Sequence, residues 1–122
     1  MSPAEAWPKH VPGEMLDIET FVREVLRAAV RSEVVSARSL GGGRVKLSEA
    51  ADSVEIQAIS AGQILRAMCV RLAVIFAEAA SQPPPLYGGT VAAELMIDER
   101  KVPATLEMSN KPSDVWFTVT VR

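Results

Sequence analysis

The amino-acid sequence predicts an α+β domain in which two helices pack on one face of an antiparallel sheet. Two segments, residues 14–38 and 60–80, repeat apolar residues at the spacing of an amphipathic helix. Three shorter segments between residues 90 and 122 alternate apolar and polar residues, with turn-forming residues between them. That pattern is typical of an antiparallel meander with one buried face. We therefore expect the order helix, hairpin, helix and three-stranded meander.

Composition limits the class of protein. The chain has 122 residues, 48% of them hydrophobic, which suits one domain with its own core. Its formal net charge of −2 does not favour nucleic acid as a partner of the whole molecule. Cys69 is the single cysteine, so no disulfide can form within the chain. Because the first residues also lack the pattern of a secretory signal, we expect a cytoplasmic protein.

Residues 1–13 are predicted to form a flexible N-terminal tail, and residues 14–122 a single α+β domain. The tail holds three prolines and no periodic apolar pattern. Trp7 is its only large apolar residue. The sequence leaves three alternatives for Trp7: it stays free with the tail, it folds onto the domain, or it contacts a partner.

The first helix is predicted over residues 14–38. Apolar residues recur on one face from Ile18 to Val30, with carboxylates near the start and arginines near the end, where each complements the helix dipole. The run Gly41-Gly42-Gly43 is expected to end this helix. Residues 44–60 then alternate apolar and polar residues in two short runs, which predicts a hairpin. A helix from Ser48 onward is the alternative.

The second helix is predicted from Ser60 or Ala61 to about Ala80. It is apolar on more than one side, which is typical of a central helix or of one that meets a second subunit. The segment is long enough to cross a bilayer, but Arg66 and Arg71 would then lie near its middle. We therefore expect a buried helix and no membrane. A run of three prolines ends it.

The three-stranded meander follows, with turns at residues 98–101 and 110–114. Pro103 falls in the second strand and has no backbone N–H for a neighbouring strand. Either this strand lies at an edge of the sheet, or Pro103 turns the missing N–H away from its neighbour.

No group of residues forms a catalytic, cofactor-binding or metal-binding signature. His10, the only histidine, falls in the predicted tail, where nothing holds it as a general base. Cys69 falls in the second helix and is expected to be a core residue. The glycine run precedes a strand rather than a helix, the reverse of a phosphate-binding loop. The pair Asp98 and Glu99 is explained by a solvated turn. We expect no enzyme, no cofactor and no metal.

Two surfaces remain as candidates for binding. The first is the non-core face of the sheet, where cover by another part of the chain is the alternative to a partner; its candidate residues are Met96, Trp116 and Thr118. The second is an arginine ridge on the first helix, which favours an anionic ligand unless it is only a solvated helix face; its residues are Arg23, Arg27, Arg31 and Arg38.

The sequence by itself does not identify a function. We interpret it as a non-enzymatic protein-interaction module, such as an adaptor, a small chaperone or an accessory subunit. The expected partner is another protein or a second copy of the chain, because open sheet edges invite strand addition and twofold homodimers are the commonest oligomers. The alternative is binding of an anionic ligand, nucleic acid included, through the arginine ridge.

Overall fold

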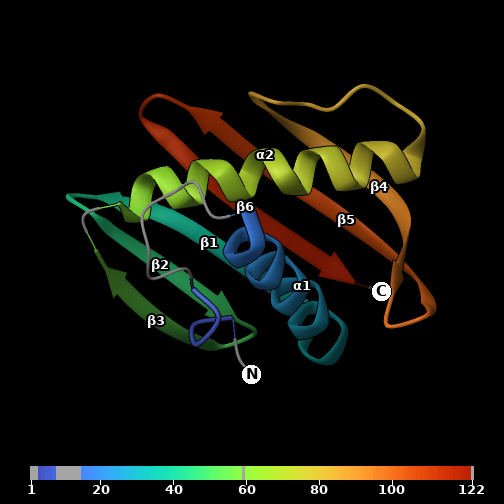
Figure 1. The fold of residues 1–122 in the computed structure, drawn as a ribbon, viewed down its shortest axis with the longest axis horizontal. Helices are drawn as coiled ribbons and strands as arrows, with labels where there is room; N and C mark the ends of the chain where they lie inside the picture. The colour runs from blue at the N-terminus through green and yellow to red at the C-terminus, as the bar shows by residue number, and fades with distance from the viewer. Residues whose placement is uncertain (1–2, 8–14, 59, 122) are drawn as a thin grey trace.

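The computed structural model describes residues 3–7, 15–58 and 60–121, which form two helices on one face of a six-stranded antiparallel sheet (Figure 1). The strand order in the sheet is β3-β2-β1-β6-β5-β4, so β3 and β4 are the edges. The α+β class is confirmed, but the predicted element order is wrong, because three strands rather than two separate the helices. In chain order the elements are α1 (Met15–Ser32), β1 (Val34–Gly41), β2 (Arg44–Glu49), β3 (Asp52–Gln57), α2 (Ala61–Ala80), β4 (Gly88–Ile97), β5 (Arg100–Lys111) and β6 (Asp114–Val121).

The first helix is shorter than predicted, because it ends before Glu33. Glu33 adopts a left-handed conformation with φ of 73°, and its N–H donates to the carbonyl of Ala29 at 2.8 Å, as at many helix ends. Val34 and Val35 follow, and β-branched residues favour a strand. Val35 is fully buried and pairs with residues of both β2 and β6. The prediction that the helix reaches residue 38 is therefore wrong, since sheet pairing decides the conformation of this segment.

The glycine run does not end a helix but turns β1 back into β2. Gly41, Gly42 and Gly43 have φ values of 79°, 61° and 74°, in the left-handed region that favours glycine. The hairpin predicted for residues 44–60 is confirmed as β2 and β3, which pair from Arg44↔Gln57 to Glu49↔Asp52. The rival helix is excluded for this segment.

The second helix is confirmed over Ala61–Ala80. It ends at Ser81, which has a left-handed φ of 55° and donates its N–H to the carbonyl of Glu78 at 3.2 Å. α2 crosses the sheet diagonally and contacts β4 more than any other strand (Figure 1). Among the residues that the structure describes, no helix is both long and apolar enough to cross a membrane.

The predicted meander is confirmed as β4, β5 and β6, and the register of β5 with β4 shows how Pro103 is accommodated. The Asn110 N–H donates to the Tyr87 carbonyl at 3.0 Å, so the alternation of the ladder makes the odd-numbered residues of β4 bond to β5. Pro103 lies opposite Glu94 in a non-hydrogen-bonded pair and turns its missing N–H away from β4. Among the described residues, the pairing of β5 with β6 runs from Ala104↔Val121 to Lys111↔Asp114.

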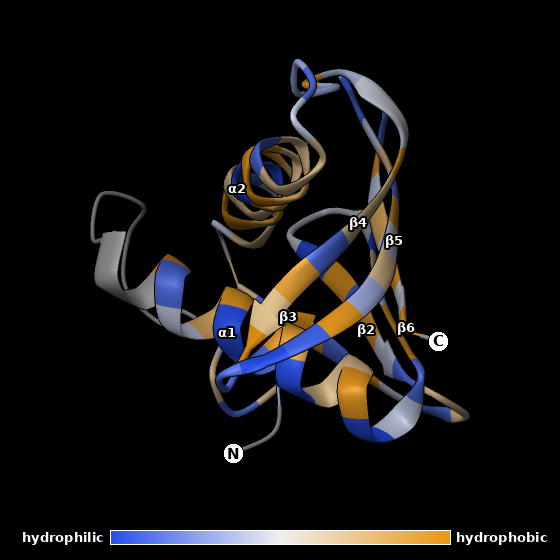
Figure 2. Cartoon of the chain, turned by 90° about the vertical axis from the view of Figure 1, so that its right-hand side faces the viewer, coloured by the Kyte–Doolittle hydropathy of each residue, from blue (hydrophilic) through white to orange (hydrophobic). Residues whose placement is uncertain are grey.

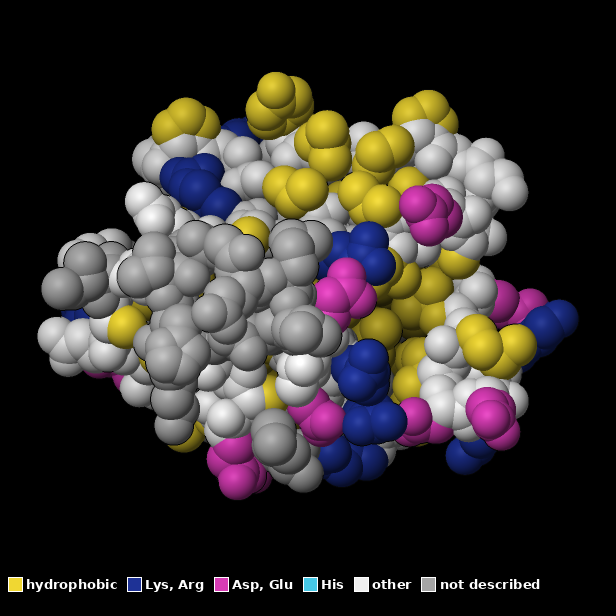
Figure 3. Space-filling view, in the orientation of Figure 1, with side chains coloured by type: hydrophobic (Ala, Val, Ile, Leu, Met, Phe, Trp, Pro, Cys, Tyr) yellow, Lys and Arg dark blue, Asp and Glu magenta, His cyan; other side chains and the backbone are white. Residues whose placement is uncertain are grey.

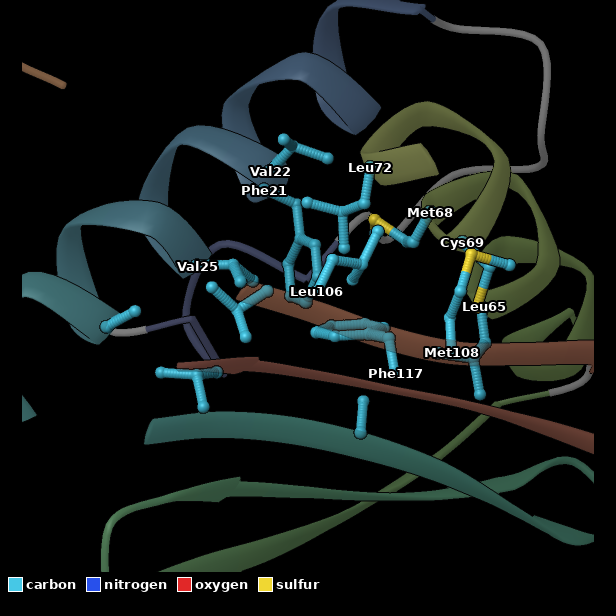
Figure 4. Close-up of a cluster of buried hydrophobic side chains, with 14 of the residues drawn as sticks. Phe21, Val22, Val25, Leu65, Met68, Cys69, Leu72, Leu106, Met108 and Phe117 are labelled. Atoms are coloured by element: carbon cyan, nitrogen blue, oxygen red, sulfur yellow. The ribbon is translucent and has the colours of Figure 1, made fainter. Parts of the chain in front are cut away.

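The core fills the space between the helix layer and the sheet layer, which Figure 2 shows edge-on. Side chains from both helices and from the central strands converge there (Figure 4). Burial of each large apolar side chain stabilises the fold by about 1.5–3 kcal/mol. The fully buried residues at the centre of the cluster are Phe21, Val25, Leu65, Met68, Leu106 and Phe117.

Trp7 belongs to this core. It is 5% exposed, and its ring meets that of Phe21 edge-on, with centroids 5.1 Å apart and an interplanar angle of 84°. Of the three expectations for Trp7, folding onto the domain is the one that the structure shows. Residues 3–6 of the predicted tail are also described, whereas residues 1–2 and 8–13, His10 among them, lie outside the described residues.

Candidate interaction surface

The outer sheet face, defined as the face turned away from the helices, carries the three residues predicted for a partner surface. Met96 on β4 is 65% exposed, whereas Trp116 and Thr118 on β6 are half-buried. Trp116 stands opposite Ser109 of β5, and Ser109 stands opposite Gly88 of β4. Gly88 and Met96 lie at opposite ends of β4, about 26 Å apart at the usual strand rise. Met96 and Trp116 of the same chain are therefore too far apart to form one patch.

Trp116 is held in place by charged neighbours. The guanidinium of Arg38 on β1 lies over the indole ring, 5.3 Å from its centroid. The indole N–H donates to Asp114 Oδ2 at 3.3 Å, and Arg38 Nη1 lies 3.4 Å from Asp114 Oδ1. Thr118 is the next outward residue of β6 and stands between Ser36 and Glu107. Arg38 thus covers Trp116 from the β1 side, and the free approach to the ring is from β5.

A shallow pocket of 340 Å³ opens beside Trp116 at the start of β4. Tyr87, which is 78% exposed, lines it together with Gly88, Ser109 and Trp116. Ser109 is 6% exposed, and its hydroxyl donates to the carbonyl of Asp114 at 2.8 Å. Because Gly88 has no side chain and Ser109 has a small one, no bulky side chain fills the floor of the pocket. The sequence gives no signal for this pocket, because nothing local places Tyr87 and Gly88 beside Trp116.

β4 has the backbone of an open sheet edge. It pairs with β5 along its whole length, Gly88–Ile97, without a register shift. Since its odd-numbered residues bond to β5, its even-numbered residues direct their N–H and C=O groups away from the sheet. The Gly88 N–H already has a partner within the chain, because it donates to the carbonyl of Pro85 at 3.2 Å. Figure 2, which faces this side of the molecule, shows β4 and β5 in front. The outward backbone groups beyond Gly88 belong to Thr90, Ala92, Glu94 and Met96.

The sequence of β4 has little that would block strand pairing. Natural edges are usually protected by short length, charge, proline or a bulge. β4 spans 10 residues, has no proline and carries one charged residue, Glu94. β3, at the other edge, spans six residues and carries Asp52 and Glu55. The N-terminal segment also lies beside β3, where Pro3 and Val54 line one small pocket. Among the residues that the structure describes, the two edges therefore differ, and β4 is the open one.

The helix above β4 adds apolar surface. Hydrophobic side chains gather along the solvent-facing side of α2 (Figure 3). Val70 is 39% exposed, and Ala67 and Val74 are half-buried. In the loop that leads to β4, Leu86 is 40% exposed. The apolar second side expected for this helix is thus turned to solvent in the single chain.

The structure does not arrange the four predicted arginines as one ridge on the first helix. Arg38 lies on β1, because α1 has already ended. Arg31 forms an ion pair with Glu49 at 2.8 Å, and the pKa of Glu49 is lowered chiefly by the hydrogen bonds from Arg31. Arg27 bonds to Asp98 and to Glu24. Arg23 is exposed on α1. Binding of an anion here stays a prediction, and three of the four guanidinium groups already have carboxylate partners.

Cys69 is a core residue, as expected. Its side chain is buried, and its thiol donates to the carbonyl of Trp116 at 3.6 Å. Burial raises the pKa of this thiol to about 12, against a smaller lowering by the nearby charge of Arg66. Such a thiol is a poor nucleophile at neutral pH. Within residues 3–7, 15–58 and 60–121, no cluster of three or more His, Cys, Asp or Glu side chains could hold a metal ion.

Comparison with known proteins adds no relative to this description. The chain matches no protein-family model, and no curated protein resembles it in sequence. The β4 edge and the Trp116 pocket are therefore interpreted from their own geometry.

Proposed function

We propose that this chain is a non-enzymatic protein-interaction module that binds an extended segment of a partner by adding a strand to β4. The observation that carries the proposal is the open edge of β4, whose outward N–H and C=O groups begin at Thr90 and end at Met96. Backbone hydrogen bonds would supply affinity, and pockets for alternate side chains would supply specificity. The pocket beside Trp116 is placed for such a side chain.

The role of an adaptor, small chaperone or accessory subunit follows from this mode of binding. Each of these classes recognises another polypeptide rather than transforming a substrate. The exposed apolar side of α2, with Val70 at its surface, supports the same proposal, since it adds area beside the open edge. Anion binding through the arginines has less support, because Arg27, Arg31 and Arg38 are engaged with Asp98, Glu49 and Asp114.

The proposal is tested by removing one outward N–H from each edge of the sheet. Ala92→Pro removes a donor from the open side of β4 and no bond to β5. Glu55→Pro is the matched control on β3. The Ala58 N–H donates to the Gly43 carbonyl at 2.9 Å, so the alternation makes the odd-numbered residues of β3 face outward.

The probe is a fluorescein-labelled peptide of alternating Thr and Val, which forms strands readily. We expect fluorescence anisotropy to show binding to the parent chain and to Glu55→Pro, and at least tenfold weaker binding to Ala92→Pro. Circular dichroism checks that both variants stay folded. Equal binding by the two proline variants, or no binding by the parent chain at concentrations where it is monomeric, would refute strand addition at β4.

A further inference from the structure

Met96 and Trp116 are far apart in one chain, but the geometry of β4 brings them together between two chains. We propose that β4 pairs antiparallel with β4 of a second copy about a twofold axis at Ala92, and that Met96 of each copy enters the pocket between Trp116 and Tyr87 of the other. This inference rests on the proposed function, because it names the occupant of the open edge.

The register follows from the directions of the backbone groups. Opposed residues in a twofold antiparallel pair must lie on the same sheet face and turn their N–H and C=O groups the same way. The axis must therefore pass through a residue and not between two residues. For a strand of 10 residues, axes at Ala92 and Ala93 give the longest overlap.

Side-chain size and polarity favour the axis at Ala92. That axis sets Met96, the largest outward side chain of β4, opposite Gly88, which has none. It sets Glu94 opposite Thr90, whose hydroxyl can donate to the carboxylate, and Ala92 opposite itself. An axis at Ala93 would set Met96 opposite Thr90 and leave Glu94 opposite Ala92. Only the axis at Ala92 places the bulky Met96 opposite Gly88, which has no side chain.

The pocket at Gly88 suits a methionine. Gly88, Ser109, Trp116 and Arg38 stand in one row across β4, β5, β6 and β1. Arg38 covers one side of the indole, so a side chain arriving over Gly88 meets the side that is still open. Methionine is flexible, and its thioether makes favourable contacts with aromatic rings. Met96 is 65% exposed in the single chain, so its insertion removes apolar surface from water.

The arrangement is self-complementary, as a twofold interface requires. Each copy offers one Met96 and one Trp116 pocket, and a single axis satisfies both pairs at once. Met96 and Trp116, two of the three residues predicted for a partner surface, thus become the two halves of one contact. The pocket is incomplete without the second copy.

Cysteine crosslinking tests the register, since the native Cys69 is buried and does not compete. We expect Ala92→Cys to form a disulfide-linked dimer on mild oxidation, because the axis sets this residue opposite itself at a Cα separation of about 5.5 Å. Thr90→Cys alone should not crosslink, whereas an equal mixture of Thr90→Cys and Glu94→Cys should. Crosslinking of Ala92→Cys with Glu94→Cys, without self-linking of Ala92→Cys, would overturn the axis at Ala92.

Solution mass by light scattering tests the occupant and the Met96 contact. We expect twice the mass of one chain for the parent protein, and about tenfold weaker dimers for Met96→Ala and for Trp116→Ala. The double variant should be little weaker than either single one. Val54→Ala on β3, which trims another exposed apolar residue, is the control and should dimerise normally.

The outcomes separate this inference from the proposed function. A parent chain that stays monomeric while its β4 edge still binds the Thr/Val peptide would overturn the second copy as occupant and leave strand addition standing. Loss of both dimer and peptide binding would overturn the proposed function itself. A dimer unaffected by Ala92→Pro would overturn the pairing of β4 with a second copy, whereas the peptide-binding test would still decide strand addition.

Discussion

The carboxylate of Asp98, in the turn between β4 and β5, accepts hydrogen bonds from the Arg27 guanidinium on α1. Arg27 Nη2 lies 2.9 Å from Asp98 Oδ1, and Nε lies 3.1 Å from both carboxylate oxygens. Arg27 also bonds to Glu24 on its own helix at 3.1 Å. An arginine that the sequence suggested for an external anion thus ties the helix layer to the end of the open strand.

This pair predicts a pH dependence of stability. The pKa of Asp98 is held below its ordinary value of 3.8, chiefly by the hydrogen bonds from Arg27, while desolvation acts in the opposite sense. A lowered folded-state pKa contributes stability above the unfolded pKa, and that contribution disappears as the pH falls through the folded pKa. Asp98→Asn should therefore lower the melting temperature slightly at neutral pH and not below the folded pKa. Melting temperatures measured from neutral pH down to below the folded pKa test this prediction.

The same experiment at high salt is its control. The pair is exposed, so screening should reduce the difference between Asp98→Asn and the parent chain at neutral pH. A difference that persists below the folded pKa, or that is indifferent to salt, would point to the turn geometry instead of the ion pair.

The turn beneath this pair predicts a stabilising substitution. Asp98 and Glu99 have φ values of 48° and 66°, so a two-residue hairpin loop holds two non-glycine residues in the left-handed region. Glu99→Gly should relieve one of these positions and raise the free energy of unfolding by about 1 kcal/mol. Urea unfolding measures it. Arg100→Gly, at the neighbouring strand position, is the control and should destabilise; a loss of stability in Glu99→Gly would contradict the prediction.

The buried Trp7 predicts that the N-terminal segment unfolds with the domain. Trp7→Ala should lower the free energy of unfolding by about 3–5 kcal/mol, because it empties a site packed against Phe21. The Trp7 indole N–H is buried without a hydrogen-bond partner among the described residues, so Trp7→Phe loses no such bond and should cost less. Urea unfolding compares the two. Equal, negligible effects would mean that Trp7 is not part of the cooperative core.

The environment of Cys69 predicts an inert thiol. Its pKa is raised to about 12, so the thiolate is scarce near pH 8, and the side chain is buried between α2 and the sheet. Labelling by a thiol reagent should be slow in the folded protein and fast in guanidinium chloride. Mass spectrometry follows the modification, with Val54→Cys on β3, where the native side chain is 48% exposed, as the exposed comparison. Rapid labelling of native Cys69 would contradict the placement of this residue in the core.

Several parts of the fold were predictable because their signals are local. The helical repeat over Ala61–Ala80, the period-two runs of β4, β5 and β6, and the β2–β3 hairpin each depend on residues close together in the chain. The same alternation correctly predicted that Met96 and Trp116 lie on the outer sheet face. Burial of Cys69 also followed from its position in an apolar helix.

The failures share a different origin. The segment after Glu33 fits either a helix or a strand, and only pairing with β2 and with the distant β6 makes it β1. Because β1 pairs with β6, Arg38 lies on a strand and not on the predicted helix. Its guanidinium lies over the Trp116 ring.

The sequence by itself thus determined the class of fold, most of its helices and strands, and the side of each predicted strand that faces water, since these depend on short-range periodicity. Only the tertiary structure decided the strand order, which makes β4 an edge and places Trp116 beside the bare floor at Gly88. Strand order is a choice among long-range pairings whose local signals are alike. It is settled by the burial of one shared core, and no short window of sequence contains that information.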